Sequence, residues 1–193
     1  MSRSNVKPLI AVLAVALLVA AVAAGGRART PEAVTVRVLG PTGAAELASG
    51  VVVAPGRVLT VAHVLAEGGR IEVDGRPATV ARTRPGQDLA LLDVPGVSGP
   101  DVRYGPARGP VRVLLPGGAE RAELRRRIVA HLTDAPGRPR RAALELAVRV
   151  APGDSGAPVV DADGDVVGIL FARSTRREGT AYAVRTDVAA ALP

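Results

Sequence analysis

Short aliphatic runs, separated by glycine, proline and Asp-Gly turns, fill the chain from Val34 onward. Valine and isoleucine fit the pleated surface of a sheet better than the turns of a helix. The spacing therefore predicts an all-β fold, because many short strands with regular turns are typical of a β-sandwich or a β-barrel. The expected strands are residues 34–39, 47–54, 57–61, 71–73, 77–82, 88–94, 111–115, 142–150, 157–161, 166–171 and 180–184.

Three other segments complete the expected organisation. Residues 119–132 contain good helix formers, yet their apolar side chains recur at every second position, so we expect a strand whose apolar row Arg126 interrupts. Residues 95–110 are rich in glycine and proline and should link two lobes. Residues 187–192 should form a short C-terminal helix.

The composition limits both the core and the chemistry. Hydrophobic residues make up 48% of the 193 residues, but aromatic residues only 2%, so valine, leucine, alanine and isoleucine must fill the core. Cysteine is absent, which excludes disulfides, a thiolate nucleophile and a cysteine-ligated zinc site. Because the chain has only 2 histidines, a histidine-rich metal site is also unexpected. We expect no metal ion and no cofactor.

Arginine carries almost all of the formal net charge of +7. The densest clusters lie in residues 125–127 and 138–141. Such clusters can bind nucleic acid or another anionic surface, or they can form a solvated face. We favour the solvated face and expect no nucleic-acid partner, because neither aromatic stacking residues nor a nucleic-acid motif accompany the charge.

The N-terminus has the pattern of an export signal. A basic start precedes an apolar run over residues 9–24, and small residues follow this run. The order predicts a signal peptide or a signal anchor over residues 1–26, a hydrophobic export helix, with residues 27–33 as a linker. Cleavage after Ala23 and retention as a membrane anchor both fit the run. In either case the rest of the chain should lie outside the cytoplasm, secreted or anchored to the cell membrane.

Three short motifs carry the candidate chemistry. His63 follows an apolar strand, Asp88 begins another, and Ser155 lies in the glycine-flanked loop of residues 153–156. A serine hydroxyl becomes an effective nucleophile when a base accepts its proton, and a histidine base needs a carboxylate to fix its tautomer. We therefore expect His63 to be the base, Asp88 its partner and Ser155 the nucleophile. Asp93 is the rival carboxylate, but it should lie at the other end of the strand.

These motifs, in this order, resemble those of the trypsin-like serine peptidases, especially the cysteine-free bacterial branch. The resemblance implies an exported serine endopeptidase that acts on protein or peptide substrates. It implies two six-stranded Greek-key β-barrels, lobes near residues 34–100 and 110–193, with the active site between them. Ala157 departs from the pattern, because many members have glycine there. The resemblance covers residues 34–193 and rests on residues 49–53, 58–64, 88–92, 153–158, 166–169 and 181–184.

The resemblance also assigns the surroundings of the nucleophile. The backbone N–H groups of Gly153 and Ser155 should form the oxyanion hole. An arginine in the wall of the substrate pocket would favour acidic side chains in the substrate. The expected walls of that pocket are Arg149, Phe171, Ala172 and Arg173.

Other interpretations of the sequence stay open at this point. The chain could keep a protease fold as a binding protein of the cell envelope without turnover, or it could bind an anionic surface through residues 125–141. The apolar run of residues 9–24 could contact a membrane. The acidic residues 161–165 could suggest a calcium loop, but their spacing does not match the twelve-residue pattern, and a hairpin around Asp163-Gly164 explains them better.

Overall fold

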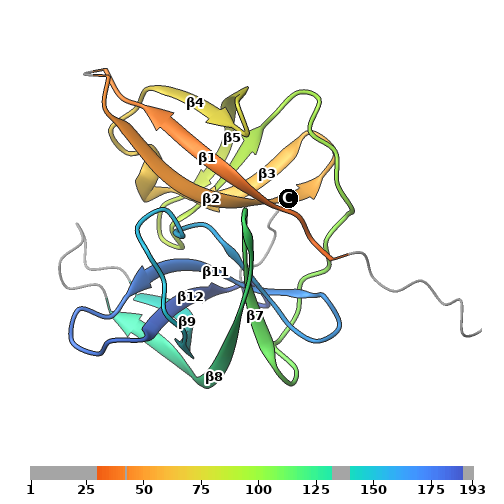
Figure 1. The fold of residues 1–193 in the computed structure, drawn as a ribbon, viewed down its shortest axis with the longest axis vertical. Coiled ribbons are helices and arrows are strands. Elements are labelled where there is room, and N and C mark those ends of the chain that lie inside the picture. Colours follow the sequence, from red (N-terminus) through yellow and green to blue (C-terminus); the bar gives the residue numbers. More distant parts are fainter. Residues whose placement is uncertain (1–29, 42, 132–139, 189–193) are drawn as a thin grey trace, which may run out of the picture.

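The fold consists of two closed antiparallel β-barrels, which lie one above the other in Figure 1. It is taken from a computed structural model that describes residues 30–41, 43–131 and 140–188. Each barrel has six strands, and each closes a Greek-key order in which a later strand returns to pair beside the first. The all-β prediction and the two-barrel architecture are confirmed.

The first barrel has the hydrogen-bonded order β1-β2-β3-β6-β5-β4, and β4 pairs with β1 to close it. A single-turn 3-10 helix, η1 (His63–Leu65), follows β3. The strands of this barrel are β1 (Ala33–Leu39), β2 (Ala45–Ala54), β3 (Arg57–Val61), β4 (Arg70–Val73), β5 (Arg76–Arg84) and β6 (Leu89–Asp93).

The second barrel has the order β10-β11-β12-β9-β8-β7, and β10 pairs with β7 to close it. The expected strand at residues 119–132 is present as β8. The alternation of apolar residues therefore predicted this segment better than the helix propensity of its residues. The strands are β7 (Val111–Leu115), β8 (Gly118–His131), β9 (Arg140–Ala147), β10 (Pro158–Val160), β11 (Val166–Arg173) and β12 (Thr180–Arg185).

Asp-Gly turns shape the hairpins as the sequence predicted. Asp74 and Gly75 both have positive φ, 47° and 75°, which is the combination that a tight two-residue turn needs between β4 and β5. The residues between β6 and β7 link the two barrels and, within the described residues, contain only one isolated bridge, between Tyr104 and Val166.

The core is aliphatic, as the composition required. One cluster of buried residues fills the first barrel and extends into the second through Ile169, Phe171 and Val184, so the two barrels are packed against each other. A second cluster, around Leu144 and Leu146, lies inside the second barrel. This packing fixes the position of one barrel relative to the other, and the candidate site lies where they meet.

Several expected boundaries differ from those observed. The strand expected at residues 142–150 is β9, which already begins at Arg140 and ends at Ala147. Asp88 precedes β6 instead of beginning it. The export segment 1–26, and residues 189–192 of the expected terminal helix, lie outside the described residues. In the part of the chain that is described, no helix has the length and apolar character needed to cross a membrane.

Replacement of Leu92 by alanine should destabilise the fold by about 2–5 kcal/mol, because it leaves a cavity in the core of the first barrel. Leu92 has no exposed surface, whereas Leu47 is 55% exposed and offers a matched control. Leu47→Ala should change the free energy of unfolding by no more than about 0.5 kcal/mol. Denaturant unfolding of both variants measures the difference, and equal effects would show that the core is placed incorrectly.

Candidate active site

Neighbouring strands of the first barrel bring His63 and Asp88 together. Val61 at the end of β3 pairs with Leu89 at the start of β6 in an antiparallel register. Ala62, which follows Val61, therefore lies beside Asp88, which precedes Leu89. The backbone N–H of Ala62 donates to the carbonyl of Asp88 at 3.0 Å. His63 opens η1 directly after this contact, so two residues 25 positions apart meet at one end of the barrel.

The Asp88 carboxylate holds His63 with both of its oxygens. Oδ1 accepts the backbone N–H of His63 at 2.8 Å, and Oδ2 lies 2.8 Å from the ring Nδ1. When Nδ1 carries the proton and donates to this carboxylate, Nε2 of the neutral ring is the free acceptor. The Asp88 side chain is almost fully buried, whereas the imidazole is 44% exposed. The aspartate is therefore a fixed partner and the histidine remains accessible.

Asp88 occupies an unusual backbone conformation. Its φ of 59° lies in the left-handed region, which residues other than glycine rarely adopt. Such a conformation persists only where the surrounding structure holds it in place. The rival Asp93 lies at the other end of β6, where it pairs with Arg57, and makes no described contact with His63.

Arg141 is a residue of this site that the sequence did not reveal. It was expected in a solvated basic cluster, and that expectation is wrong for Arg141, which is 7% exposed. From β9 of the second barrel its Nη1 reaches Asp88 Oδ2 at 3.4 Å. Its Nε and Nη2 donate to the carbonyls of Gly86 and Pro85 at 3.2 and 3.4 Å, and its guanidinium lies over the Phe171 ring.

No local signal in the sequence places Arg141, because the apolar residues Leu144 and Leu146 lie on the opposite side of β9. Arg141, Ala143 and Glu145 alternate along β9, so all three point to the same side of the strand. Ala143 and Glu145 are buried, and Arg141 is buried with them.

The loop of Ser155 is bound to the first barrel through Ser49 of β2. The backbone N–H of Ser49 donates to the carbonyl of Ser155 at 2.7 Å, and its hydroxyl donates to the carbonyl of Gly153 at 3.0 Å. Thr60 of β3 in turn donates its hydroxyl to the carbonyl of Ser49 at 2.7 Å. The serine loop is thus joined to the strand that leads to His63.

Gly156 has to be glycine for this loop to approach so closely. A Cβ atom there would lie 1.9 Å from the carbonyl oxygen of Ser49 and 2.6 Å from the hydroxyl of Thr60, and the φ of Gly156 is +94°. Its N–H donates to the carbonyl of Leu170 in β11 at 2.7 Å. Ala157, which departs from the family pattern, is fully buried and pairs with the N–H of Leu170 at 2.9 Å.

The N–H groups of the loop alternate between bonded and free. Those of Asp154 and Ala157 donate to carbonyls within the loop, and the Asp154 carboxylate accepts the N–H of Ala151 at 2.7 Å. Those of Gly153 and Ser155 have no acceptor among the described residues. The Ser155 hydroxyl also makes no hydrogen bond to His63 within the described chain, a contact that is often long before substrate binds.

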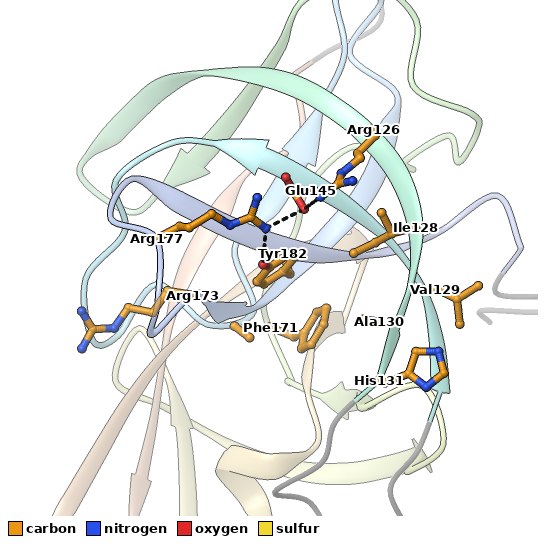
Figure 2. A pocket seen from close by; sticks show the side chains of 11 residues that line it. Arg126, Ile128, Val129, Ala130, His131, Glu145, Phe171, Arg173, Arg177 and Tyr182 are labelled. Carbon is orange, nitrogen blue, oxygen red and sulfur yellow. Dashed lines mark hydrogen bonds and ion pairs between the residues drawn. The ribbon is translucent and has the colours of Figure 1, made fainter.

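Three of the four expected substrate-pocket residues share one pocket of about 460 Å³ (Figure 2). Phe171, Ala172 and Arg173 line one side of it, at the end of β11. Arg149 does not line this pocket; it pairs with Glu178 at 3.3 Å in a solvent-exposed position. The pocket therefore adjoins the strand that contacts the serine loop.

The acidic segment at residues 161–165 forms the expected hairpin. The Asp161 carboxylate is buried and accepts the N–H groups of Asp163 and Asp165, both at 3.1 Å. Asp165 pairs with Arg103 at 2.7 Å. The Asp161 carboxylate is thus used by the turn and the Asp165 carboxylate by an ion pair, and the described residues contain no cluster of three or more His, Cys, Asp or Glu side chains that could hold a metal ion.

Comparison with known proteins agrees with this architecture. Residues 48–169 match the model of the trypsin-like peptidase domain, and the chain therefore belongs to the trypsin-like peptidase family. Serine protease Rv3671c of Mycobacterium tuberculosis H37Rv and serine protease MT3772 of M. tuberculosis CDC 1551 are each 34% identical to it in an alignment of 161 residues that covers 75% of this chain. This chain spans 41% of the length of these curated relatives.

Solved structures give the same result. The active form of the Rv3671c protease from M. tuberculosis superimposes with a TM-score of 0.74 at 29% identity, covering 98% of this chain and 89% of that one. The HtrA-type protease AlgW with a tripeptide superimposes with a TM-score of 0.62 at 27% identity, covering 84% of this chain and 58% of that one. The fold around the site is thus the fold of these proteases.

A double-mutant cycle should reveal the link between Arg141 and Asp88. Loss of either partner leaves a buried charge uncompensated, so Arg141→Met and Asp88→Asn should each destabilise strongly, while the double variant should lose less than their sum. We expect a coupling free energy of about 0.5–3 kcal/mol from denaturant unfolding.

The exposed pair of Arg57 and Asp93 is the matched control, because both side chains are 44% exposed. The cycle of Arg57→Met and Asp93→Asn should give a coupling of only about 0–1 kcal/mol. A smaller coupling for the Arg141 cycle than for this surface pair would mean that Arg141 does not support Asp88.

Proposed function

We propose that this chain is a serine endopeptidase that hydrolyses peptide bonds with His63, Asp88 and Ser155. The observation that carries the proposal is the pair of hydrogen bonds between the buried Asp88 carboxylate and His63, one to the backbone N–H and one to the ring Nδ1, both at 2.8 Å. These two hydrogen bonds select the tautomer and the orientation that a histidine base requires. The names of the similar proteins, serine proteases of M. tuberculosis, support the same reaction class.

The proposed reaction follows from the roles of these groups. The Ser155 hydroxyl oxygen attacks the carbonyl carbon of the scissile bond while its proton passes to Nε2 of His63. The developing oxyanion accepts hydrogen bonds from the free N–H groups of Gly153 and Ser155. His63 then gives its proton to the leaving amine as the C–N bond breaks. Water repeats the sequence, releases the acyl group and restores the serine hydroxyl.

Asp88 stabilises the imidazolium that forms in this reaction and remains ionised throughout. Arg141 serves the reaction indirectly, because it binds the carboxylate and the two carbonyls that precede it. Gly153 and Gly156 have positive φ, 99° and 94°, which glycine adopts without strain, so the loop can turn sharply on both sides of Ser155. Substrates of this site would be proteins or peptides.

The proposal predicts that Ser155→Ala abolishes both peptide hydrolysis and covalent labelling by a fluorophosphonate. Only the nucleophile's oxygen is lost, so the free energy of unfolding should stay within about 0.5 kcal/mol of wild type. Ser98→Ala is a control, because Ser98 is exposed in the link between the two barrels and its hydroxyl makes no hydrogen bond to another described residue. Absence of labelling in the wild-type protein would instead favour a protease fold that acts only as a binding protein.

We also propose that residues 27–193 act outside the cytoplasm, directed there by the apolar run of residues 9–24. An externally added protease should digest this part of the chain in cells whose outer layers have been permeabilised but whose cytoplasmic membrane is intact. A cytoplasmic marker protein should survive the same treatment. Protection of residues 27–193 together with that marker would refute the proposal, and mass spectrometry of the N-terminus would separate cleavage after Ala23 from a retained anchor.

A further inference from the structure

The pocket shown in Figure 2 is built on one row of residues across four strands. Ala172 of β11 pairs with Tyr182 of β12, Tyr182 with Glu145 of β9, and Glu145 with Arg126 of β8. Residues in such a row share one face of the sheet. Phe171, which belongs to the cluster shared by both barrels, and Ile128, which packs against that cluster, add apolar walls. The pocket therefore lies on the outer face of the second barrel, beside the junction of the barrels.

Glu145 anchors two arginines in this pocket. Its side chain is 3% exposed, and its Oε2 accepts Nη2 of Arg126 and Nη2 of Arg177, both at 3.0 Å. The hydrogen bond from Arg126, and then that from Arg177, lower the pKa of Glu145 below its ordinary value. Glu145 is therefore ionised at neutral pH, and the cluster of one carboxylate and two guanidinium groups keeps a surplus of one positive charge.

The two arginines are held in place but keep unused donors. Arg177 also donates Nη2 to the Tyr182 hydroxyl at 3.2 Å, and the Ser174 hydroxyl fixes the turn that presents it. Nε and Nη1 of Arg126 and Arg177 have no partner among the described residues. A guanidinium with free donors matches a carboxylate, which can accept two parallel hydrogen bonds. Arg173 adds positive charge at the rim, although its side chain extends away from Glu145 in Figure 2.

An open strand edge leads from the serine loop to this pocket. β10 pairs with β11 only up to Ile169, and Leu170 is bound by Gly156 and Ala157 of the serine loop. Beyond Leu170 the register shifts at Phe171, and Ala172 and Arg173 then pair with β12 on one side and have no described strand on the other. An extended peptide can add to such an edge through main-chain hydrogen bonds, and its alternate side chains then enter neighbouring pockets.

We propose that the Arg126–Arg177 pocket binds an acidic side chain of the peptide substrate and sets a preference for aspartate or glutamate near the scissile bond. The inference rests on the proposed peptidase function and adds to it a subsite with named donors. Glu145 is the positioning residue of this subsite, since it orders both arginines without occupying their remaining donors. Of the two arginines that the sequence suggested for an acidic preference, Arg173 lines this pocket and Arg149 does not.

The test uses pairs of peptides that differ only in having aspartate or asparagine at one position. That position is changed from pair to pair, so that the pairs cover both sides of the scissile bond. With the full chain, one position should show a kcat/KM about 5- to 20-fold higher for aspartate, as a charge-assisted pair in a half-exposed pocket provides. Arg126→Gln and Arg177→Gln should each reduce that ratio to about 2 or less, and high salt should reduce it in wild type. Arg70→Gln is the control, because Arg70 also pairs with a glutamate, Glu72, but lies on β4 of the other barrel.

Two measurements separate this proposal from the proposed function. Fluorophosphonate labelling shows that each variant is folded and has an intact nucleophile. Binding of the same peptide pair to the Ser155→Ala protein reports on the pocket without turnover: aspartate should bind more tightly, and Arg177→Gln added to that background should remove the difference. Equal binding and equal kcat/KM for aspartate and asparagine at every position would overturn the subsite, as would a preference that both arginine variants retain.

Discussion

The buried contact of Arg141 with Asp88 is the interaction on which the site depends. A carboxylate that is removed from water needs compensation, and His63 alone supplies only a neutral donor while the ring is unprotonated. Arg141 supplies the cation, and because it comes from β9, the compensation crosses from one barrel to the other. The same guanidinium binds the carbonyls of Pro85 and Gly86, so it also holds the segment that places Asp88 at a φ of 59°.

This arrangement explains why the barrels have to be packed together before the site exists. Asp88 and His63 belong to the first barrel, whereas Arg141 and the serine loop belong to the second. Ser49 of the first barrel binds the serine loop and Thr60 binds the Ser49 carbonyl, and at Gly156 the close approach leaves no room for a side chain. The shared aliphatic cluster brings these groups into reach, and the polar contacts then fix their positions.

The sequence predicted the features that depend on local patterns. Alternation of apolar residues and Asp-Gly turns predicted the strands, and the resemblance carried by the three motifs predicted the two barrels. The motifs also predicted that Asp88 is the partner of His63, and the two side chains are in contact. Arg141 was missed because its burial is decided by residues 85–88, between β5 and β6 of the other barrel, and by Phe171, none of which is near it in sequence. Arg126 looked like an interruption of an apolar row for the same reason, since its partner Glu145 is supplied across the β8–β9 register.

β9 joins the site and the pocket through a single face. Arg141 and Glu145 lie four residues apart on it, with Ala143 between them, and Phe171 contacts the Arg141 guanidinium while lining the pocket. The two charge clusters on this face differ in their balance. At the site one carboxylate meets one arginine and a histidine, so the cation is used within the protein. At the pocket one carboxylate meets two arginines, so one positive charge remains for a ligand. A substrate carboxylate would balance the positive charge that remains at the pocket, as Asp88 balances the charge of Arg141 at the site. This balance of charge is the physical reason to place an acidic side chain there.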